Sequence, residues 1–186
     1  MDRRKSRTER AIKAAFSELI CEKSYSEISI QDVIDRADVA RATFYDHYKN
    51  KEEVLRSISA GIFAHVNAET LSAEKHHDFS HEKDFLHRIV HLLCHLYEDK
   101  GVISGILASE SHDIFLDDLR RHLDMSFERG YCPPEGLNVP EEIVKNHAVT
   151  SLMELVLWWM KIDGCKTPPR EMADYYFLLL GMGRAQ

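Results

Sequence analysis

Glycine, proline and cysteine are scarce in this sequence of 186 residues, which contains 8, 5 and 4 of them. No segment alternates apolar and polar residues as a β-strand does, so the sequence predicts an all-α fold. The signatures of catalytic sites are also missing. There is no Ser or Cys nucleophile elbow, no phosphate-cradling glycine loop and no HExxH motif. We therefore expect no enzyme activity and no cofactor.

The cysteines and the apolar runs indicate in which cellular compartment the protein works. The four cysteines lie far apart and form no CxxC pair, which argues against a disulfide scaffold or a zinc ribbon. The N-terminus is highly charged, and the longest apolar run, residues 152–160, contains Glu154 and is too short to span a bilayer. These features predict a cytoplasmic protein with reduced thiols and no membrane partner.

The net charge of −7 is unevenly distributed along the chain. Through Arg56 there are 12 Lys and Arg against 11 Asp and Glu, a net of +1, so the remaining 12 against 20 carry −8. Basic side chains nevertheless crowd the N-terminus, where such an arm suits DNA phosphates or the minor groove. They are Arg3, Arg4, Lys5, Arg7 and Arg10.

Residues 29–48 contain two short helical patterns separated by a tight polar turn. Ser29 with Asp32 three residues later predicts a capped helix start, and apolar residues then recur at helical spacing through Ala37. Asp38 tolerates the left-handed backbone that a sharp turn between helices commonly requires, and Val39 would fill that turn. This arrangement is typical of a helix-turn-helix.

The second of these helices presents the polar residues that we expect to contact DNA. Phe44 and Tyr48 lie four apart and face inward, which leaves their neighbours exposed. The Arg41 guanidinium can bond guanine O6 and N7, although a phosphate contact is the alternative. Lys51 begins the next helix, where its ammonium and the free amides would together bind an anion. The predicted DNA-binding set is Ser29, Gln31, Arg41, Ala42, Thr43, Tyr45, His47, Lys49 and Lys51.

This segment resembles the DNA-binding domain of the TetR family of bacterial transcriptional regulators. The resemblance rests on Ser29-Ile30, on Ala37-Asp38-Val39 at the turn, on Ala42-Thr43-Phe44-Tyr45, and on the residues 48–55 that follow. Asp38 stands where the family usually has glycine, and Ala40 where it often has a serine cap worth about 1 kcal/mol. The resemblance implies a repressor that binds double-stranded DNA, at an inverted repeat, as a homodimer.

The helical patterns predict two parts. Residues 1–50 would form a three-helix DNA-binding domain with the helix-turn-helix, its first helix at about 6–23. Residues 51–186 would form a helical ligand-binding and dimerisation domain. Asn50 with Glu53 predicts a capped helix from 51 to about 73, which would join the parts. Further helices are expected at about 85–100, 103–109, 114–129, 141–163 and 168–181, with loops at 76–81 and 132–140.

The last two predicted helices are apolar on nearly every side. A helix of this kind must be buried all round, which in a domain of this size suggests a second subunit. A purely intramolecular core is the alternative. The predicted dimer interface consists of Val149, Leu152, Val156, Trp159, Tyr176, Leu179 and Leu180.

By resemblance, the C-terminal helices should also enclose a small-molecule effector pocket. The segment from Trp158-Trp159 to the final helix is similar to a TetR-like subset that includes regulators of dihydroxyacetone kinase genes, some of which act through protein partners. A protein partner is therefore the alternative to a pocket ligand. Candidate pocket residues, each also compatible with plain core, are Phe63, Leu93, Tyr97, Ile106, Phe115, Met125, Phe127, Met153 and Trp158.

His87, His91 and His95 recur every four residues, on the side of their helix that we expect to face away from the core. Two imidazoles at this spacing can hold one zinc or nickel ion. A metal-responsive repressor is thus a further alternative, and an ordinary polar helix face is the simpler interpretation.

Overall fold

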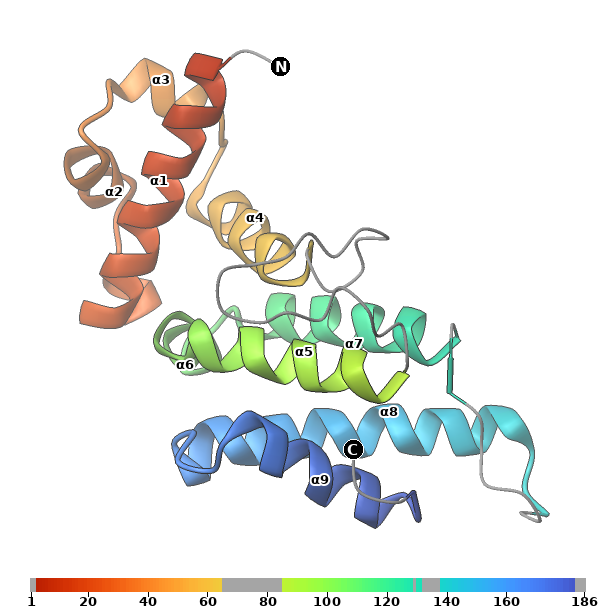
Figure 1. Ribbon diagram of the computed structural model, residues 1–186. Coiled ribbons are helices and arrows are strands. Elements are labelled where there is room, and N and C mark those ends of the chain that lie inside the picture. Colours follow the sequence, from red (N-terminus) through yellow and green to blue (C-terminus); the bar gives the residue numbers. More distant parts are fainter. Residues whose placement is uncertain (1–2, 65–84, 129, 132–137, 183–186) are drawn as a thin grey trace. The chain divides into compact units, whose positions relative to one another are not determined.

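The computed structural model describes residues 3–64, 85–128, 130–131 and 138–182 (Figure 1). Within these ranges every regular element is a helix, so the predicted all-α class is confirmed. The chain divides into two compact units, Met1–Ile62 with Gly101–Asp118, and Phe63–Lys100 with Leu119–Gln186. The predicted helix beyond residue 64, the loop 76–81 and most of the break at 132–140 lie outside the described residues.

The first unit contains the predicted helix-turn-helix. Its elements are α1 (Arg3–Glu22), the short 3-10 helix η1 (Tyr25–Glu27), α2 (Ile30–Ala37), α3 (Arg41–Tyr45), most of α4 (Lys51–Ala64) and α6 (Lys100–Leu107). Helix α1 begins about three residues earlier than its apolar pattern predicted. Its buried Ile12 and Phe16, with Val33 of α2 and Phe44 of α3, belong to the core that fixes the outer faces of α2 and α3.

Helix α6 lies against the C-terminal end of α1 at unusually short range. A methyl group at Gly105 would lie 2.5 Å from the carbonyl oxygen of Ile20, which no real Cβ tolerates. Four residues earlier, a methyl group at Gly101 would meet only Cys21 Sγ, at 3.6 Å. Gly105 thus permits a backbone-to-backbone contact between two helices of the first unit.

The second unit consists of α5 (Phe85–Glu98), the latter part of α7 (His112–Glu128), α8 (Glu141–Trp158), the π-helical turn η2 (Trp159–Asp163) and α9 (Pro169–Leu179). The predicted helix 141–163 is therefore α8 continued by a wider turn, which ends at Gly164 with φ 63° as expected. The prolines begin α9 one residue later than predicted, because Pro168 is the N-cap and Pro169 the first helical residue.

Two hydrogen bonds, one buried and one partly buried, fasten α9 and the chain before it to α8 and η2. Tyr176 Oη donates to the carbonyl oxygen of Ala148 at 2.7 Å, and Trp159 Nε1 donates to that of Thr167 at 2.9 Å. Burial raises the pKa of Tyr176. None of the helices that the structure describes is both long and apolar enough to cross a membrane.

Candidate DNA-binding surface

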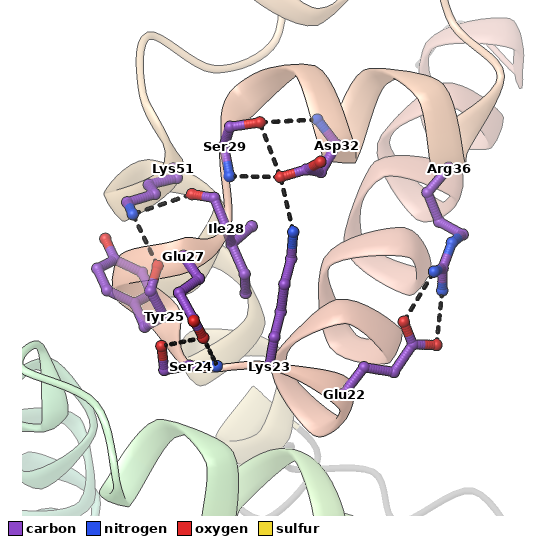
Figure 2. A network of polar contacts seen from close by, with 10 residues as sticks. All are labelled: Glu22, Lys23, Ser24, Tyr25, Glu27, Ile28, Ser29, Asp32, Arg36 and Lys51. Carbon is purple, nitrogen blue, oxygen red and sulfur yellow. Dashed lines mark hydrogen bonds and ion pairs between the residues drawn. The ribbon is translucent and has the colours of Figure 1, made fainter.

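The start of α2 is fixed by a capping box that the sequence predicted. The Asp32 amide donates to Ser29 Oγ at 3.1 Å, and the Ser29 amide donates to Asp32 Oδ2 at 2.7 Å (Figure 2). Lys23 Nζ, from the chain after α1, reaches the same carboxylate oxygen at 2.9 Å. The Lys23 bond, followed by the bonds from Ser29, holds the pKa of Asp32 far below its usual range.

The turn between α2 and α3 also has the predicted geometry. Asp38 adopts the left-handed conformation, with φ 50° and ψ 52°, and so replaces the glycine of the family pattern without changing the turn. Val39, half-buried, donates its amide to the carbonyl oxygen of Ile34 at 3.3 Å. Ala40 is the N-cap of α3. It supplies no side-chain cap bond, as expected for an alanine in the place where the family often has serine.

An ion-pair cluster holds α2 on α1. Arg36 bonds both carboxylate oxygens of Glu22, at 3.0 and 2.8 Å (Figure 2). Arg36 Nη1 also donates to Glu18 Oε2 at 3.1 Å. The paired geometry suits the planar fork of arginine and, together with the buried Val33 and Ile34, it holds α2 in one orientation. The side chains on the opposite face of α2 are therefore presented in a defined direction.

The structure places the predicted DNA-contacting set on or near the surface and its apolar neighbours inside. Phe44 and Tyr48 are buried, as predicted. Tyr45 is 44% exposed. Ser29, Gln31, Arg41, Ala42 and Lys49 are exposed as well, whereas Thr43, His47 and Lys51 are half-buried. The contact of these residues with DNA stays a prediction.

Three members of the set are brought together across α2 and α3. Arg41 Nη1 donates to Gln31 Oε1 at 3.1 Å, and the Arg41 guanidinium lies over the Tyr45 ring, 5.6 Å from its centroid. Gln31 Nε2 in turn donates to Asp35 Oδ1 at 2.8 Å. Asp35 was not among the predicted site residues, although its spacing of four from Gln31 on a helix could have predicted this contact.

Lys51 is the first residue of α4, as predicted, and its ammonium makes contacts that the sequence did not predict. Its ammonium donates to the carbonyl oxygens of Tyr25, at 2.7 Å, and Ile28, at 3.0 Å, and lies 4.3 Å from the centroid of the Tyr25 ring (Figure 2). Desolvation lowers the pKa of Lys51. Lys51 thus ties the start of α4 to η1, and the anion site expected at this ammonium stays a prediction.

The cap of α4 follows the prediction with one difference. Asn50 Oδ1 accepts from the Glu53 amide at 2.8 Å, which is the expected cap. The Glu53 carboxylate returns to the amide of Lys49, at 2.7 Å, one residue before the expected partner. The Lys49 side chain itself is 85% exposed, and so it is available to a phosphate.

A short helix pair with a left-handed turn, braced by a long first helix and presenting arginine, tyrosine and threonine outward, defines a helix-turn-helix DNA-binding protein. A family model described as "Bacterial regulatory proteins, tetR family" matches residues 12–58. A second, described as "Transcriptional regulator C-terminal region", matches residues 83–180. The chain belongs to the TetR family of DNA-binding transcriptional regulators.

Individual relatives agree with this assignment. The uncharacterized HTH-type transcriptional regulator YxbF of Bacillus subtilis (strain 168) is 38% identical over 81 residues, which are 43% of this chain and 21% of that protein. The HTH-type dhaKLM operon transcriptional activator DhaS of Lactococcus lactis subsp. lactis (strain IL1403) is 36% identical over 59 residues, 32% of each protein. The matches thus span only about a fifth to a third of these curated relatives.

Solved structures extend the similarity along the chain. A TetR transcriptional regulator from Streptococcus agalactiae 2603V is 28% identical, with 96% of each chain covered and a TM-score of 0.71. The dihydroxyacetone kinase operon activator DhaS shares the fold at 20% identity, with 93% of each chain covered and a TM-score of 0.67. The predicted resemblance to regulators of dihydroxyacetone kinase genes is thereby confirmed.

The nine predicted pocket residues belong to both units. Ile106 and Phe115 are buried in the first unit. In the second unit Phe63, Leu93 and Phe127 are buried, Tyr97, Met125 and Met153 are half-buried, and Trp158 is 48% exposed. Tyr97 stacks on Trp159, with ring centroids 6.1 Å apart. A ligand pocket formed by these residues stays a prediction.

The residues predicted for the dimer interface are mostly core residues of one chain. Val149, Leu152, Val156, Trp159 and Tyr176 are buried without any second subunit, so they cannot form an exposed docking face. Leu180 is half-buried, and Leu179 is 80% exposed. The same elements expose other large apolar side chains that were not in the predicted interface set, namely Trp158, Ile162, Tyr175 and Leu178.

The histidines of α5 do not lie on the side that the sequence predicted. His91 and His95 are buried, with their Nε2 atoms 3.0 Å apart, and His87 is half-buried. His95 Nδ1 lies 3.6 Å from Glu98. Among the described residues, no group of three His, Cys, Asp or Glu side chains is arranged to hold a metal ion.

Proposed function

We propose that this protein regulates transcription in the cytoplasm as a homodimer that binds an inverted-repeat operator through α3 and the start of α2. The observation that carries the proposal is the group of Arg41, Gln31 and Tyr45, held together on the surface by two contacts. Arginine bonded at guanine O6 and N7 is the commonest specific contact in the major groove. An arginine fixed beside a short helix-turn-helix is suited to that contact.

The remaining polar residues of the set would position the protein on the DNA backbone. Ser29, Tyr45 and Lys49 can donate to phosphate oxygens, and such contacts supply half or more of the hydrogen bonds in protein–DNA interfaces. Thr43 can bond a base edge or place its methyl group on thymine, and Ala42 permits close approach. His47 can contact a phosphate. Phosphate contacts fix the register, and Arg41 reads the sequence.

Dimerisation would use the apolar side chains that α8, η2 and α9 leave exposed. Leu178 and Leu179 are 51% and 80% exposed, and Ile162 is 72% exposed. Exposed apolar groups of this size on neighbouring segments are typical of subunit interfaces. A two-fold dimer presents its two recognition helices about one turn of DNA apart, roughly 34 to 36 Å, which predicts a symmetric operator.

Regulation would depend on an effector that prefers one state of the dimer. A ligand with equal affinity for the DNA-competent and DNA-incompetent states shifts nothing, so an inducing ligand must favour the incompetent one. Repression relieved by a small molecule follows from the family. Control by a protein partner, with activation, is the second candidate, because the relative DhaS is an operon activator.

Selection of random duplex DNA by the purified protein tests the proposal. We expect an enriched inverted repeat that binds roughly 10³-fold or more tightly than random DNA of the same length at the same salt concentration. Transcription in vitro from a promoter carrying the repeat then separates repression from activation. A selected pool without symmetry would contradict the dimeric operator, and a pool without enrichment would contradict the DNA-binding role.

A further inference from the structure

Asp35, Gln31 and Arg41 form a bonded chain across the outer faces of α2 and α3, which we call the Asp35–Gln31–Arg41 relay. Its two hydrogen bonds measure 2.8 and 3.1 Å, and its last member also lies over the Tyr45 ring. We infer that Asp35 and Gln31 are positioning residues that hold the Arg41 guanidinium for base recognition. This inference rests on the proposed DNA-binding function and adds two determinants of its specificity.

The chemistry of the three groups permits only one direction of bonding. An ionised carboxylate accepts hydrogen bonds and cannot donate, so the NH₂ end of the Gln31 amide must face Asp35. The amide oxygen is then left for Arg41, whose guanidinium donates and cannot accept. Without the carboxylate the amide is free to turn its NH₂ group towards the guanidinium, and two donors cannot bond. Asp35 therefore acts on Arg41 through Gln31.

The position of Asp35 does not favour α2 or DNA binding on general electrostatic grounds. Asp35 is exposed in the last turn of α2, where a negative charge opposes the helix dipole. A negative charge close to a phosphate surface also weakens binding to every DNA sequence. Both effects make a carboxylate at position 35 unfavourable. Its bond to Gln31, in contrast, requires a hydrogen-bond acceptor at this position.

The relay also leaves Arg41 free to read a base. Arg41 uses one of its five donors in the relay, so enough remain for the two acceptors of guanine. The bonds of Gln31 to Asp35 and Arg41 fix the direction of its amide. We therefore expect Arg41, held by this amide, to read a guanine.

The test compares base preference and overall affinity in the full-length protein. The base pair read by Arg41 is first located in the selected DNA as the one at which Arg41→Ala loses discrimination. Asp35→Asn should then reduce the preference for guanine at that pair about two- to tenfold, the range expected when one side chain must be ordered on binding. Affinity for random DNA should stay unchanged or rise, because a negative charge is removed.

Three further variants separate positioning from charge and from folding. Asp46→Asn removes the same charge from the exposed residue after α3, outside the relay, and should retain the preference. Asp35→Glu keeps a carboxylate at the same helical spacing and should also retain it. Gln31→Met breaks the relay in its middle and should lose preference as Asp35→Asn does. Melting temperatures measured for all variants identify any that are unfolded.

A double variant provides the decisive comparison. If Asp35 acts through Arg41, Asp35→Asn combined with Arg41→Ala should show the same base preference as Arg41→Ala alone. Full guanine preference in folded Asp35→Asn and Gln31→Met, with Arg41→Ala defective, would overturn the relay and leave the proposed function intact. Wild-type protein that enriches no DNA sequence would overturn the proposed function, and the relay with it.

Discussion

Replacing Gly105 by alanine tests the contact between α6 and α1. The added methyl group would lie 2.5 Å from the Ile20 carbonyl oxygen and 3.2 Å from Ile20 Cγ1. Two of its neighbours are backbone atoms of α1, which cannot rotate away as a flexible side chain would. The helices must therefore separate by roughly 1 Å, since ordinary contact begins at about 3.4 Å.

The net effect is a balance of two magnitudes. Alanine in a helix interior is favoured over glycine by up to about 1 kcal/mol, whereas overpacking a tight contact costs about 1 to 3 kcal/mol. Because the obstacle is backbone, we place the overpacking near its upper end and expect Gly105→Ala to lower the free energy of unfolding by about 1 to 2 kcal/mol. For a protein of this size that is a fall in Tm of roughly 2 to 8 °C.

Gly61→Ala is the matched control. Gly61 is exposed in α4, and no atom of the described residues lies within 4 Å of an added methyl group. The propensity gain should then act alone and raise stability by about 0.5 to 1 kcal/mol. Urea denaturation of both variants followed by circular dichroism measures the difference. Equal stabilisation by both alanines would refute the close approach of α6 to α1.

Three further variants test the polar contacts. Lys51→Met keeps the aliphatic part of the side chain but leaves the carbonyls of Tyr25 and Ile28 without the ammonium. We expect the free energy of unfolding, measured by urea denaturation, to fall by about 1 kcal/mol. Unchanged stability with weakened DNA binding would instead support the predicted anion site. Tyr176→Phe should also cost about 1 kcal/mol, because a buried hydroxyl bond is lost, and no change would contradict that bond. Asp32→Asn should flatten the acid dependence. The Asp32 pKa is lowered by folding, so the stabilisation that Asp32 contributes is present above its ordinary pKa near 4 and is lost as the pH falls below it. Melts from pH 5 to 2 should therefore show a smaller loss of stability in the variant than in wild type, because Glu22 and Glu27, whose pKa values are also lowered, remain in both.

The parts of the fold that were predicted correctly depend on residues close in sequence. Ser29 and Asp32 lie within one helical turn of each other, and Asp38 adopts its turn conformation from its own backbone preference. The cap of α4 by Asn50 is equally local. Interactions at this range follow from spacing and residue type, so the start of α2 and the turn at Asp38 could be predicted to the residue.

The features that the sequence did not predict depend on contacts between residues far apart in the chain. Lys51 bonds the carbonyl of Tyr25, 26 residues earlier, and no spacing rule relates these positions. Residues 149–160 and 175–180 are apolar on nearly every side of their helices, so periodicity could not tell the buried faces from the exposed ones. Trp159 is therefore buried within the chain, whereas Trp158, its neighbour, is the exposed one. The imidazoles of α5 were misplaced because polar residues were assigned to the outside by default.

The candidate DNA-binding surface falls between these cases. Arg41 was identified from its place in the second helix of the pattern. Its partner Gln31 was identified separately, as a residue at a helix start, and the bond between them requires the angle between α2 and α3. That angle is set by the turn at Asp38 and by core packing around Phe44, which only the folded unit defines.

The most direct test of DNA reading by α3 is a complete set of binding constants for wild type and Arg41→Ala on the selected operator. Each base pair of the operator is substituted in turn, at one fixed salt concentration. We predict that Arg41→Ala loses about 1 to 3 kcal/mol of discrimination at one position in each half-site and keeps wild-type preferences elsewhere. An equal loss of affinity for every sequence would show that Arg41 contacts a phosphate and would contradict this account.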